Sequence, residues 1–592
     1  MHLVFANNFP DAANCLLTIN NVKDLAGNSI RNATANFSYH APHNIQQYDI
    51  IIDEIMIDPT PPVGLPNNEW IELKNASSFP IDLQGFTISN MAEKSSAMPT
   101  FILQPDSFVI ICTASAVTAM STFGKTISVT NFPSLNNTED FISLNTADGK
   151  TIHAIQYSAG WYQNKLKENG GWSLEMINPK NPCAGLANWK ASTDLKGGTP
   201  GKTNSVNSNT ADHDSPKLLR AFANDSLHII LSFDEPLDSL KAISINNYSV
   251  NKNINIENVA CIPPLFSQVK LKLANPLLQH NIYTITAGNI TDCSGNVVDY
   301  HNTAKTGLHT VADSLDIVIN EILFNPKDNG VDYVELYNRS NKIINLKQTY
   351  IANQNSNGDI DNIVPLSNYD HLLFPQDFVV ATSSPAIVKA QYITFNPDAF
   401  VTVNNMPSFN DDKGAVIILN AEGNTIDELI YNASWHFKLI NNPQGVALER
   451  INYNAPTPSS NNWHSAATST GRGTPTYKNS QYNTDQQLTG EISVIPAIIS
   501  PDNNGTDDFA TIDYQFPEAG NIASITIFDG SGKPIRNLQQ NALCGTSGNY
   551  HWDGLGENNQ QLPAGIYIIY TTIFNLNGKT QYFKNTIVLA RN

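Results

Sequence analysis

The sequence predicts an all-β protein, and three observations support this fold class. Charged residues make up only 15% of the chain, whereas about 25% is typical of soluble globular proteins. Long runs of Glu, Lys, Leu and Ala, which surface helices favour, are missing. Short alternating stretches rich in Thr, Ile, Val, Tyr and Phe replace them and are typical of strands. At 592 residues the chain is too long for one hydrophobic core, and about four domains are expected.

The acidic composition argues against a nucleic-acid partner. The chain has 34 basic and 53 acidic residues, which gives a net charge of −19. Such a charge repels phosphate backbones, and no cluster of Lys and Arg reverses it locally. No stretch of about 20 apolar residues occurs, so no transmembrane segment is predicted. The first residues, Met1–Asn7, lack the charged region and apolar core of a signal peptide.

Two copies of a long unit follow one another, about 270 residues apart. Four pairs of segments carry the repeat: Ile52–Pro59 with Ile319–Pro326, Glu69–Asn75 with Asp332–Asn338, Gly171–Glu175 with Gly445–Glu449, and Gly198–Pro200 with Gly473–Pro475. Because the spacing varies little along the unit, the two copies differ only in loop length.

A strand followed by a glycine turn marks a second kind of domain. Leu17–Ile19 leads into the turn Asp24–Asn28, and Tyr283–Ile285 leads into Asp292–Asn296. Asp, Asn and Gly suit such a turn because they tolerate left-handed backbone angles. The pattern resembles the end of a bacterial Ig-like domain. The copy at 212–312 looks whole, whereas 1–45 resembles a C-terminal remnant, so we expect a missing N-terminal portion.

The longer segments, 46–206 (the first module) and 314–481 (the second module), resemble lamin-tail domains. The resemblance rests on Ile-x-Glu-Ile…Pro, on Glu-Trp-Ile-Glu-Leu or its partner, on Gly-x-x-Leu-Glu, and on a closing Gly-Thr-Pro. It implies an Ig-like β sandwich for each module, and the chain is therefore expected to be a multidomain string of Ig-like β sandwiches. Period-two alternation places Trp70 on the opposite face of its strand from Ile71 and Leu73.

The C-terminal domain, 488–592, opens with a loop at Ser500–Phe509 and continues with a strand at Ser524–Asp529. Trp552–Gly554, Leu562–Tyr567 and Lys584–Arg591 follow in order. This arrangement resembles the C-terminal Ig-like domains of gliding-motility and type IX-secreted proteins. The resemblance implies export across the outer membrane, an export or anchoring machinery as partner, and an extracellular or outer-membrane surface location in a bacterium. It leaves open whether the domain is removed.

Motifs of catalysis are missing from the sequence. It contains no Gly-x-Ser-x-Gly, no phosphate-binding glycine loop and no paired metal spacing among its 13 histidines. His436 and His464, beside tryptophans in the second module only, are predicted to take surface or capping roles. We therefore predict that the chain is not an enzyme.

Three pairs of glutamates recur between the modules: Glu54 with Glu321, Glu72 with Glu335, and Glu175 with Glu449. Paired acids serve as the acid and base of glycosidases or bind cations. A structural role would preserve them equally in both copies, and strand glutamates that hydrogen-bond at one end of a sandwich are the favoured interpretation.

Calcium is the only cofactor that the sequence suggests. Asp502, Asn504, Asp507 and Asp508 cluster in a glycine-containing loop and offer hard oxygen ligands at short spacing. The related family loop carries one more central Asp. The alternative is a turn held by hydrogen bonds from side chains to backbone.

The six cysteines form no Cys-x-x-Cys pair, which excludes a zinc ribbon or a thioredoxin-type motif. They are Cys15, Cys112, Cys183, Cys261, Cys293 and Cys544. Cys261 and Cys293 fall in one domain and could pair, although most of the six are expected to be small buried apolar residues.

The leading hypothesis is a non-catalytic secreted or cell-surface protein for structure and adhesion, whose β modules act as spacers and binding surfaces. One alternative is the accessory portion of a secreted hydrolase, such as a nuclease or a polysaccharide-degrading enzyme, with its catalytic domain upstream. The other is a carbohydrate-binding protein in which exposed Trp70, Trp161, Trp172 or Trp435 stacks on sugar rings. Surface glycans or other surface proteins are the expected partners.

Overall fold

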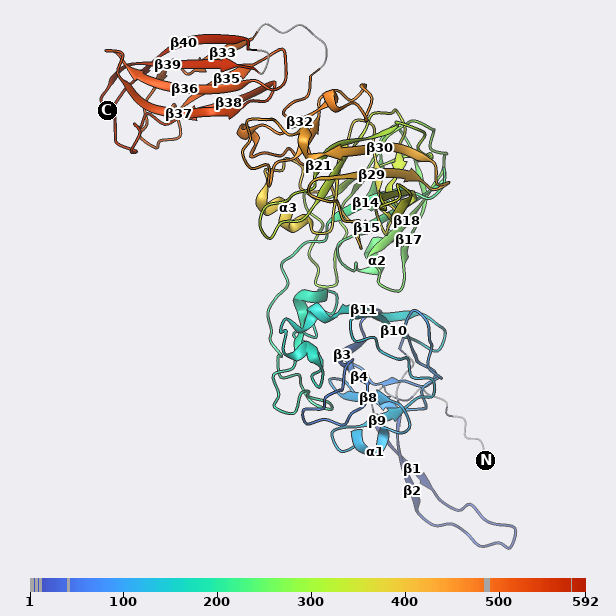
Figure 1. The fold of residues 1–592 in the computed structure, drawn as a ribbon. Helices are drawn as coiled ribbons and strands as arrows, with labels where there is room; N and C mark the ends of the chain where they lie inside the picture. Colours follow the sequence, from blue (N-terminus) through green and yellow to red (C-terminus); the bar gives the residue numbers. More distant parts are fainter. Residues whose placement is uncertain are drawn as a thin grey trace. The chain divides into compact units, whose positions relative to one another are not determined.

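The computed structural model describes residues 5, 9, 13–39, 43–483, 490–575 and 578–591 (Figure 1). Most of Met1–Asn7 and the first two residues of the expected C-terminal domain, 488–489, lie outside this described part. The chain is an all-β, multidomain string of Ig-like sandwiches, as predicted. It forms two compact units, Met1–Leu277 with Tyr283–Thr306 and Leu278–Ile282 with Gly307–Asn592.

The first unit begins with a two-stranded hairpin, β1 (Ala13–Ile19) and β2 (Ala33–Tyr39). The first module follows, with a large sheet of six strands in the order β13-β12-β3-β4-β8-β9. Their bounds are β3 Ile50–Met56, β4 Trp70–Asn75, β8 Phe108–Cys112, β9 Thr126–Ser128, β12 Leu174–Met176 and β13 Trp189–Ala191. The facing sheet contains β6 Thr87–Ser89, β10 Glu139–Asn145 and β11 Thr151–Ser158, and β5 Ile81–Asp82 pairs with β7 Ile102–Leu103.

Strands β3 and β4 lie in the middle of the large sheet and are buried on both faces. Ile71 and Leu73 pack into the core shared with the facing sheet. Trp70 packs on the other face against Met56 and Ile110, under the helical turn α1 (Val117–Met120). The predicted opposition of Trp70 to Ile71 and Leu73 is confirmed. It also explains why β3 is a continuous apolar run interrupted only by Asp53 and Glu54.

The remainder of the first unit is the middle Ig-like domain. One sheet has the order β14-β15-β18-β17 and the other β16-β19-β20. The bounds are β14 Leu218–Ala223, β15 His228–Phe233, β16 Tyr248–Val250, β17 Ile256–Ile262, β18 Gln268–Leu273, β19 Tyr283–Ala287 and β20 Thr303–Thr306, with α2 at Ser239–Ala242.

A disulfide bond joins Cys183 of the first module to Cys293 of the middle domain. The pairing of Cys261 with Cys293 is therefore wrong, and Cys261 is a free, half-buried thiol. Two of the four free cysteines, Cys112 and Cys544, are the buried apolar residues that we expected. Sequence alone missed the bond because its two cysteines belong to different domains, 110 positions apart.

The second unit repeats the architecture of the first module. Its large sheet has the order β28-β27-β22-β21-β31-β32, facing β25-β24-β29-β30, with β23 paired to β26. The bounds are β21 Ile317–Leu323, β22 Tyr333–Asn338, β23 Ile344–Asn345, β24 Thr349–Gln354, β25 Ile360–Pro365, β26 Leu372–Leu373, β27 Phe378–Thr382, β28 Phe400–Thr402, β29 Lys413–Asn420, β30 Thr425–Asn432, β31 Leu448–Arg450 and β32 Trp463–Ser465. A short helix, α3 (Pro385–Gln391), connects the parallel strands β27 and β28.

The C-terminal domain is a sandwich of a three-stranded sheet, β33-β35-β38, and a five-stranded sheet, β34-β40-β39-β36-β37 (Figure 1). The bounds are β33 Glu491–Ile495, β34 Ile498–Ile499, β35 Ala510–Gln515, β36 Ile522–Asp529, β37 Pro534–Leu543, β38 Ser547–Trp552, β39 Gly565–Phe574 and β40 Thr580–Leu589. The last strand, β40, pairs with β39 along its whole length. In the part of the chain that the structure describes, no helix has the length and apolarity needed to cross a bilayer.

Peptide mapping tests the disulfide. A tryptic digest of the unreduced protein, alkylated before digestion, should contain peptide 181–190 linked to peptide 273–305, because these carry Cys183 and Cys293. Peptide 253–270 should carry an alkylated Cys261. Reduction before alkylation is the control and should release the two linked peptides. A link between peptides 253–270 and 273–305 would contradict the structure.

Candidate functional site: buried carboxylates in both modules

Three glutamates lie side by side across three neighbouring strands of each large sheet. In the first module Glu54 on β3 is the direct partner of Glu72 on β4 and of Glu175 on β12. In the second module the corresponding residues pair in the same register, Glu321 with Glu335 and Glu449. All six side chains are fully buried. The structure therefore brings together the recurring acids that the sequence singled out.

A β-bulge places these acids. The register of β3 against β4 shifts between Ile52 and Glu54, and the register of β21 against β22 shifts between Ile319 and Glu321. A bulge inserts one unpaired residue and re-aims the side chains beside it. The bulged residue is Asp53 in the first module. Both modules therefore bury a polar pair in a strand that is otherwise apolar.

The Gly-Thr-Pro loop covers the acids and supplies their hydrogen-bond donors. The backbone N–H of Thr199 donates to Oε1 of Glu54 at 2.7 Å, and its hydroxyl lies 2.8 Å from Oε1 of Glu175 and 3.2 Å from Oε2 of Glu54. Two residues on, the N–H of Gly201 donates to Oε2 of Glu72. Gly198 precedes them because a Cβ there would lie 2.9 Å from Oε1 of Glu54. One loop thus contacts all three glutamates.

The second module repeats this network. The N–H of Thr474 lies 3.0 Å from Oε1 of Glu321, and its hydroxyl lies 2.6 Å from Oε2 of Glu321 and 2.9 Å from Oε1 of Glu449. The N–H of Thr476 donates to Oε2 of Glu335. The recurrence of Gly-Thr-Pro with the three glutamates is therefore one structural unit, although its members are scattered through the sequence.

A paired difference between the modules keeps one oxygen satisfied. In the first module the Ser173 hydroxyl donates to Oε1 of Glu54. The corresponding position of the second module is Ala447, and there the Tyr333 hydroxyl donates to Oε1 of Glu321 instead. Tyr333 takes the place of Trp70, whose indole has no hydrogen-bond partner among the described residues. The donor has moved to another strand while the acceptor stays the same.

A second difference leaves two oxygens unsatisfied. The amide of Asn320, the bulged residue of the second module, donates to Oε1 of Glu335 at 2.7 Å. The first module has Asp53 at this position. Within the described residues, neither Oδ1 of Asp53 nor Oε1 of Glu72 has a hydrogen-bond partner. A proton on either carboxyl group supplies the donor that the amide supplies in the other copy.

The electrostatics favour such a proton. Burial raises the pKa of Asp53 to about 7, although Lys74 opposes the shift. Burial, and then repulsion from Glu54, raises the pKa of Glu72 well above its ordinary value. In the second module burial and Glu321 raise the pKa of Glu449 to about 8. Carboxyl groups in these surroundings keep protons at pH values where exposed acids are ionised.

Two further buried residues were missed by sequence reasoning. Nδ1 of His153 accepts a hydrogen bond from the N–H of Ile52 at 2.7 Å, and burial lowers the pKa of His153 to about 4, so its ring is neutral. In the second module Asp427 accepts from Ile319 at 2.8 Å and forms a buried ion pair with Arg450 at 3.1 Å. His153 and Asp427 thus both accept a backbone N–H from the strand that carries the bulge, although they are different residue types. A search for residues that are identical in the two modules therefore finds neither.

These clusters are suited to holding a fold together and not to turnover. A glycosidase needs its two carboxyl groups in contact with a sugar, whereas the six glutamates have no exposed surface. Their oxygens already accept hydrogen bonds from the closing loop. The structural interpretation of the glutamates is the one that the geometry supports.

In the predicted calcium loop, three backbone N–H groups donate to the Asp508 carboxylate, from Asp502, Asn503 and Gly505. Oδ1 of Asp502 accepts from the N–H of Asn504 at 3.1 Å. Hydrogen bonds to backbone lower the pKa of Asp508. Asp507 has a left-handed backbone, with φ 54°. The loop is thus a network of turns, and calcium binding by it stays a prediction.

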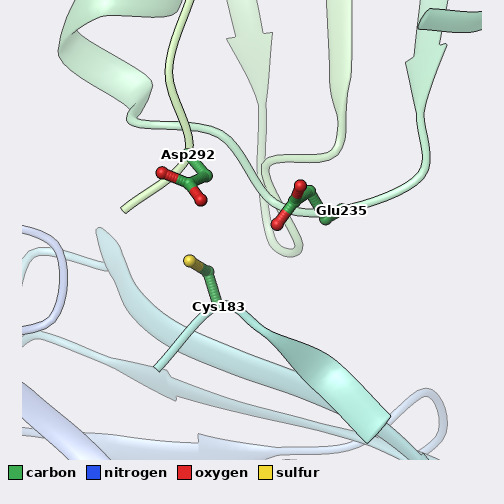
Figure 2. A group of neighbouring side chains, drawn as sticks. All are labelled: Cys183, Glu235 and Asp292. Atoms are coloured by element: carbon green, nitrogen blue, oxygen red, sulfur yellow. The ribbon is translucent and has the colours of Figure 1, made fainter. Parts of the chain in front are cut away.

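Cys183, Glu235 and Asp292 form another group of polar side chains, and they face one another in Figure 2. Their sulfur and carboxylate oxygens lie within 4.8 Å of one another. A metal would need Cys183 as a thiolate, but its sulfur is bonded to Cys293. What remains is a pair of neighbouring carboxyl groups beside a disulfide.

The tryptophans and histidines singled out from the sequence lie mostly inside. Trp70 is fully buried and Trp161 is 8% exposed, so neither stacks on a sugar at the surface. Trp172 and Trp435 are half-buried. Of the surface or capping roles predicted for His436, the surface role is wrong, because its ring is buried and its Nδ1 lies 2.9 Å from the Ser465 hydroxyl; the residue stands at the C-terminal cap of the turn Ala433–Trp435. His464 is half-buried.

A known family matches part of each module. The lamin tail domain model matches residues 43–159 and 310–433. Both matches end before Glu175, Thr199 and their counterparts. The matched segments supply two glutamates of each cluster, whereas the third glutamate and the closing loop belong to an extension that both copies share. No curated protein matches the chain in sequence.

Solved structures resemble the chain only weakly. The N-terminal part of the bacterial S-layer protein SbsC is 14% identical, with 37% of this chain and 44% of that chain covered and a TM-score of 0.15. PorZ, a surface component of the type IX secretion system of Porphyromonas gingivalis, is 11% identical over 88% of this chain and 74% of its own, with a TM-score of 0.15. The glucan-binding SGBP-B of Bacteroides ovatus is 11% identical over 64% and 72%, with a TM-score of 0.14. Scores this low support no inference about function.

Exchanging the bulged residues should change the pH dependence of the stability of both modules in opposite directions. Between pH 4 and 7 wild-type folded Asp53 keeps a proton that the unfolded chain loses, so the stability of the first module falls as pH rises. Asp53→Asn should remove the contribution of Asp53 to this fall, while the contributions of Glu54 and Glu72 stay, and should raise the free energy of unfolding at pH 8 by roughly 1–3 kcal/mol, with little effect at pH 4. Calorimetry at both pH values measures it.

The reciprocal variant, Asn320→Asp, is the matched control. It should leave the first module unchanged and increase the loss of stability with rising pH that the raised pKa of Glu449 already gives the second module. Equal stabilities of Asp53→Asn and wild type at pH 8 would contradict a proton on the carboxyl groups of Asp53 and Glu72.

Replacing the bridging hydroxyl should destabilise the first module. Thr199→Val keeps the shape of the side chain but removes the hydroxyl that lies between Glu54 and Glu175 and donates its single proton to one of them, which should cost roughly 1–3 kcal/mol. Thr118→Val, at an exposed position of α1, is the control and should change stability little. Chemical unfolding measures both, and equal losses in the two variants would show that the hydroxyl does not hold the loop.

Proposed function

We propose that this protein is a secreted or cell-surface protein of a bacterium, without catalytic activity, whose β modules act as spacers and binding surfaces. The observation that carries the proposal is the disulfide between Cys183 and Cys293. Disulfides persist in oxidising compartments and are rare in the cytosol. This bond also joins two domains, which is useful in a string of modules that has to keep its geometry outside the cell.

The buried carboxylates support the non-catalytic part of the proposal. The acids that recur in both modules are buried in a structural hydrogen-bond network. The part of the chain that matches a known family matches the lamin tail domain model twice. An accessory role beside a hydrolase remains the second candidate, because tandem β modules would serve equally as its spacers. Surface glycans and other surface proteins are the partners proposed for the exposed faces.

The C-terminal domain is proposed to direct export and to engage the export or anchoring machinery. Support comes from the order of its sequence motifs and from its two-sheet sandwich. Calcium at Asp502, Asn504, Asp507 and Asp508 is part of the same proposal. Chelation by EDTA should then lower the melting temperature of this domain, whereas Asp508→Asn should be insensitive to EDTA.

Location and oxidation can be tested together in cells. Denatured, unreduced protein from the surface fraction should accept four maleimide–polyethylene glycol tags, one on each of the four free cysteines. Reduction should release the two cysteines of the disulfide for further tagging. Protease added to intact cells should degrade the protein. A pool confined to the cytoplasm, with every cysteine reactive before reduction, would refute the proposal.

A further inference from the structure

A small cavity lies in the first unit, where the first module meets the middle domain. Its volume is about 200 Å³, which is below the roughly 300–1,000 Å³ of pockets for drug-sized ligands. Trp161 and Trp189 line one side, and Phe233 and Pro236 line another. The Glu235 carboxyl belongs to the same lining. The cavity thus suits a molecule with a single ring or a short chain.

A buried donor in the cavity wall lacks its usual acceptor. In the second module the indole N–H of Trp463 donates to the carbonyl of Thr457 at 2.9 Å. Trp189 is the corresponding residue of the first module. It is fully buried, and its indole nitrogen has no partner in the part of the chain that the structure describes. The position that corresponds to Thr457 is Cys183, which lines the cavity and bonds to Cys293.

The Glu235 carboxyl group has no partner in the described part of the chain. Among the described residues no hydrogen bond or ion pair involves its carboxyl group, which faces Asp292 in Figure 2. Asp292 accepts both its hydrogen bonds from Asn296. Lys217 forms its ion pair with the neighbouring Asp234, at 3.6 Å, and not with Glu235.

The surrounding acids perturb Glu235 further. Burial, then repulsion from Asp292, Asp234, Asp212 and Asp214, raises the pKa of Glu235 to about 8. A cation placed beside Glu235 would relieve this repulsion. No lysine, arginine or histidine is among the described residues that line the cavity.

We propose that this cavity binds a small organic ammonium ion, with its charged group against Glu235 and its apolar body between Trp161 and Phe233. Aromatic faces and a carboxylate are the two groups that attract such cations from water. A hard metal ion fits less well, because calcium takes six to eight oxygen ligands and the disulfide removes the thiolate. This site is independent of the location and the structural role proposed above.

The benzylammonium ion is a suitable probe, with benzyl alcohol as its neutral counterpart. Added to the full chain at pH 7, benzylammonium should quench tryptophan emission in a saturable way, since Trp161 and Trp189 line the cavity. Benzyl alcohol should bind at least tenfold more weakly. Binding should also release a proton, because the cation lowers the pKa of Glu235, so the calorimetric heat should depend on the ionisation enthalpy of the buffer.

Glu235→Gln should weaken benzylammonium binding at least tenfold and abolish the buffer dependence. Glu257→Gln is the matched control, because it removes one acidic group from the same domain at an exposed pair with Lys272, and its affinity should equal that of wild type. Three results would each overturn the proposal. They are equal affinities for benzylammonium and benzyl alcohol, the lack of saturable binding in the millimolar range, and displacement of benzylammonium by calcium chloride in the wild type but not in Glu235→Gln.

Discussion

Each lamin-type module depends on closing one loop over three glutamates that solvent does not reach. Buried carboxyl groups are costly unless each oxygen has a donor. The hydroxyl of Thr199 or Thr474 lies within hydrogen-bond distance of two of the three, and backbone N–H groups of the same loop donate to Glu54 and Glu72 or to their counterparts. The sheet and the closing loop therefore have to form together. This requirement explains why short motifs far apart in the sequence recur as a group.

The closing segment also connects each module to the next domain of its unit. In the second unit, the Gln481 N–H donates to Glu449 at 2.8 Å, and the Gln481 amide donates to the carbonyl of Cys544 at 3.1 Å. In the first unit the segment runs on past Val206, whose N–H donates to Glu175 at 3.1 Å. The carboxylate cluster of a module is thereby mechanically linked to its neighbour.

Much of this organisation could be predicted from sequence. The all-β class and the tandem repeat follow from local patterns, and the glutamates stood out because they recur at the same positions. The hydrogen-bond partners of these glutamates could not be predicted. Nothing in a linear comparison shows that Gly-Thr-Pro meets Glu54, because the contact crosses about 145 positions. His153 and Asp427 share one task with different chemistry, and the Cys183–Cys293 bond depends on how two domains pack. Contacts that rest on packing leave no local pattern.

The exchange of Ser173 and Trp70 for Ala447 and Tyr333 has a genetic consequence. Two related repeats in one gene are substrates for homologous recombination. A crossover between the Trp70/Tyr333 position and the Ser173/Ala447 position would combine the first residue of one module with the second residue of the other. One product would combine Trp70 with the alanine, so that Oε1 of the buried glutamate would lose its hydroxyl donor and keep only the backbone N–H of the closing loop. The other would combine Tyr333 with the serine and crowd two hydroxyl groups onto one oxygen. A hybrid module would therefore satisfy this buried oxygen less well than either parent module does.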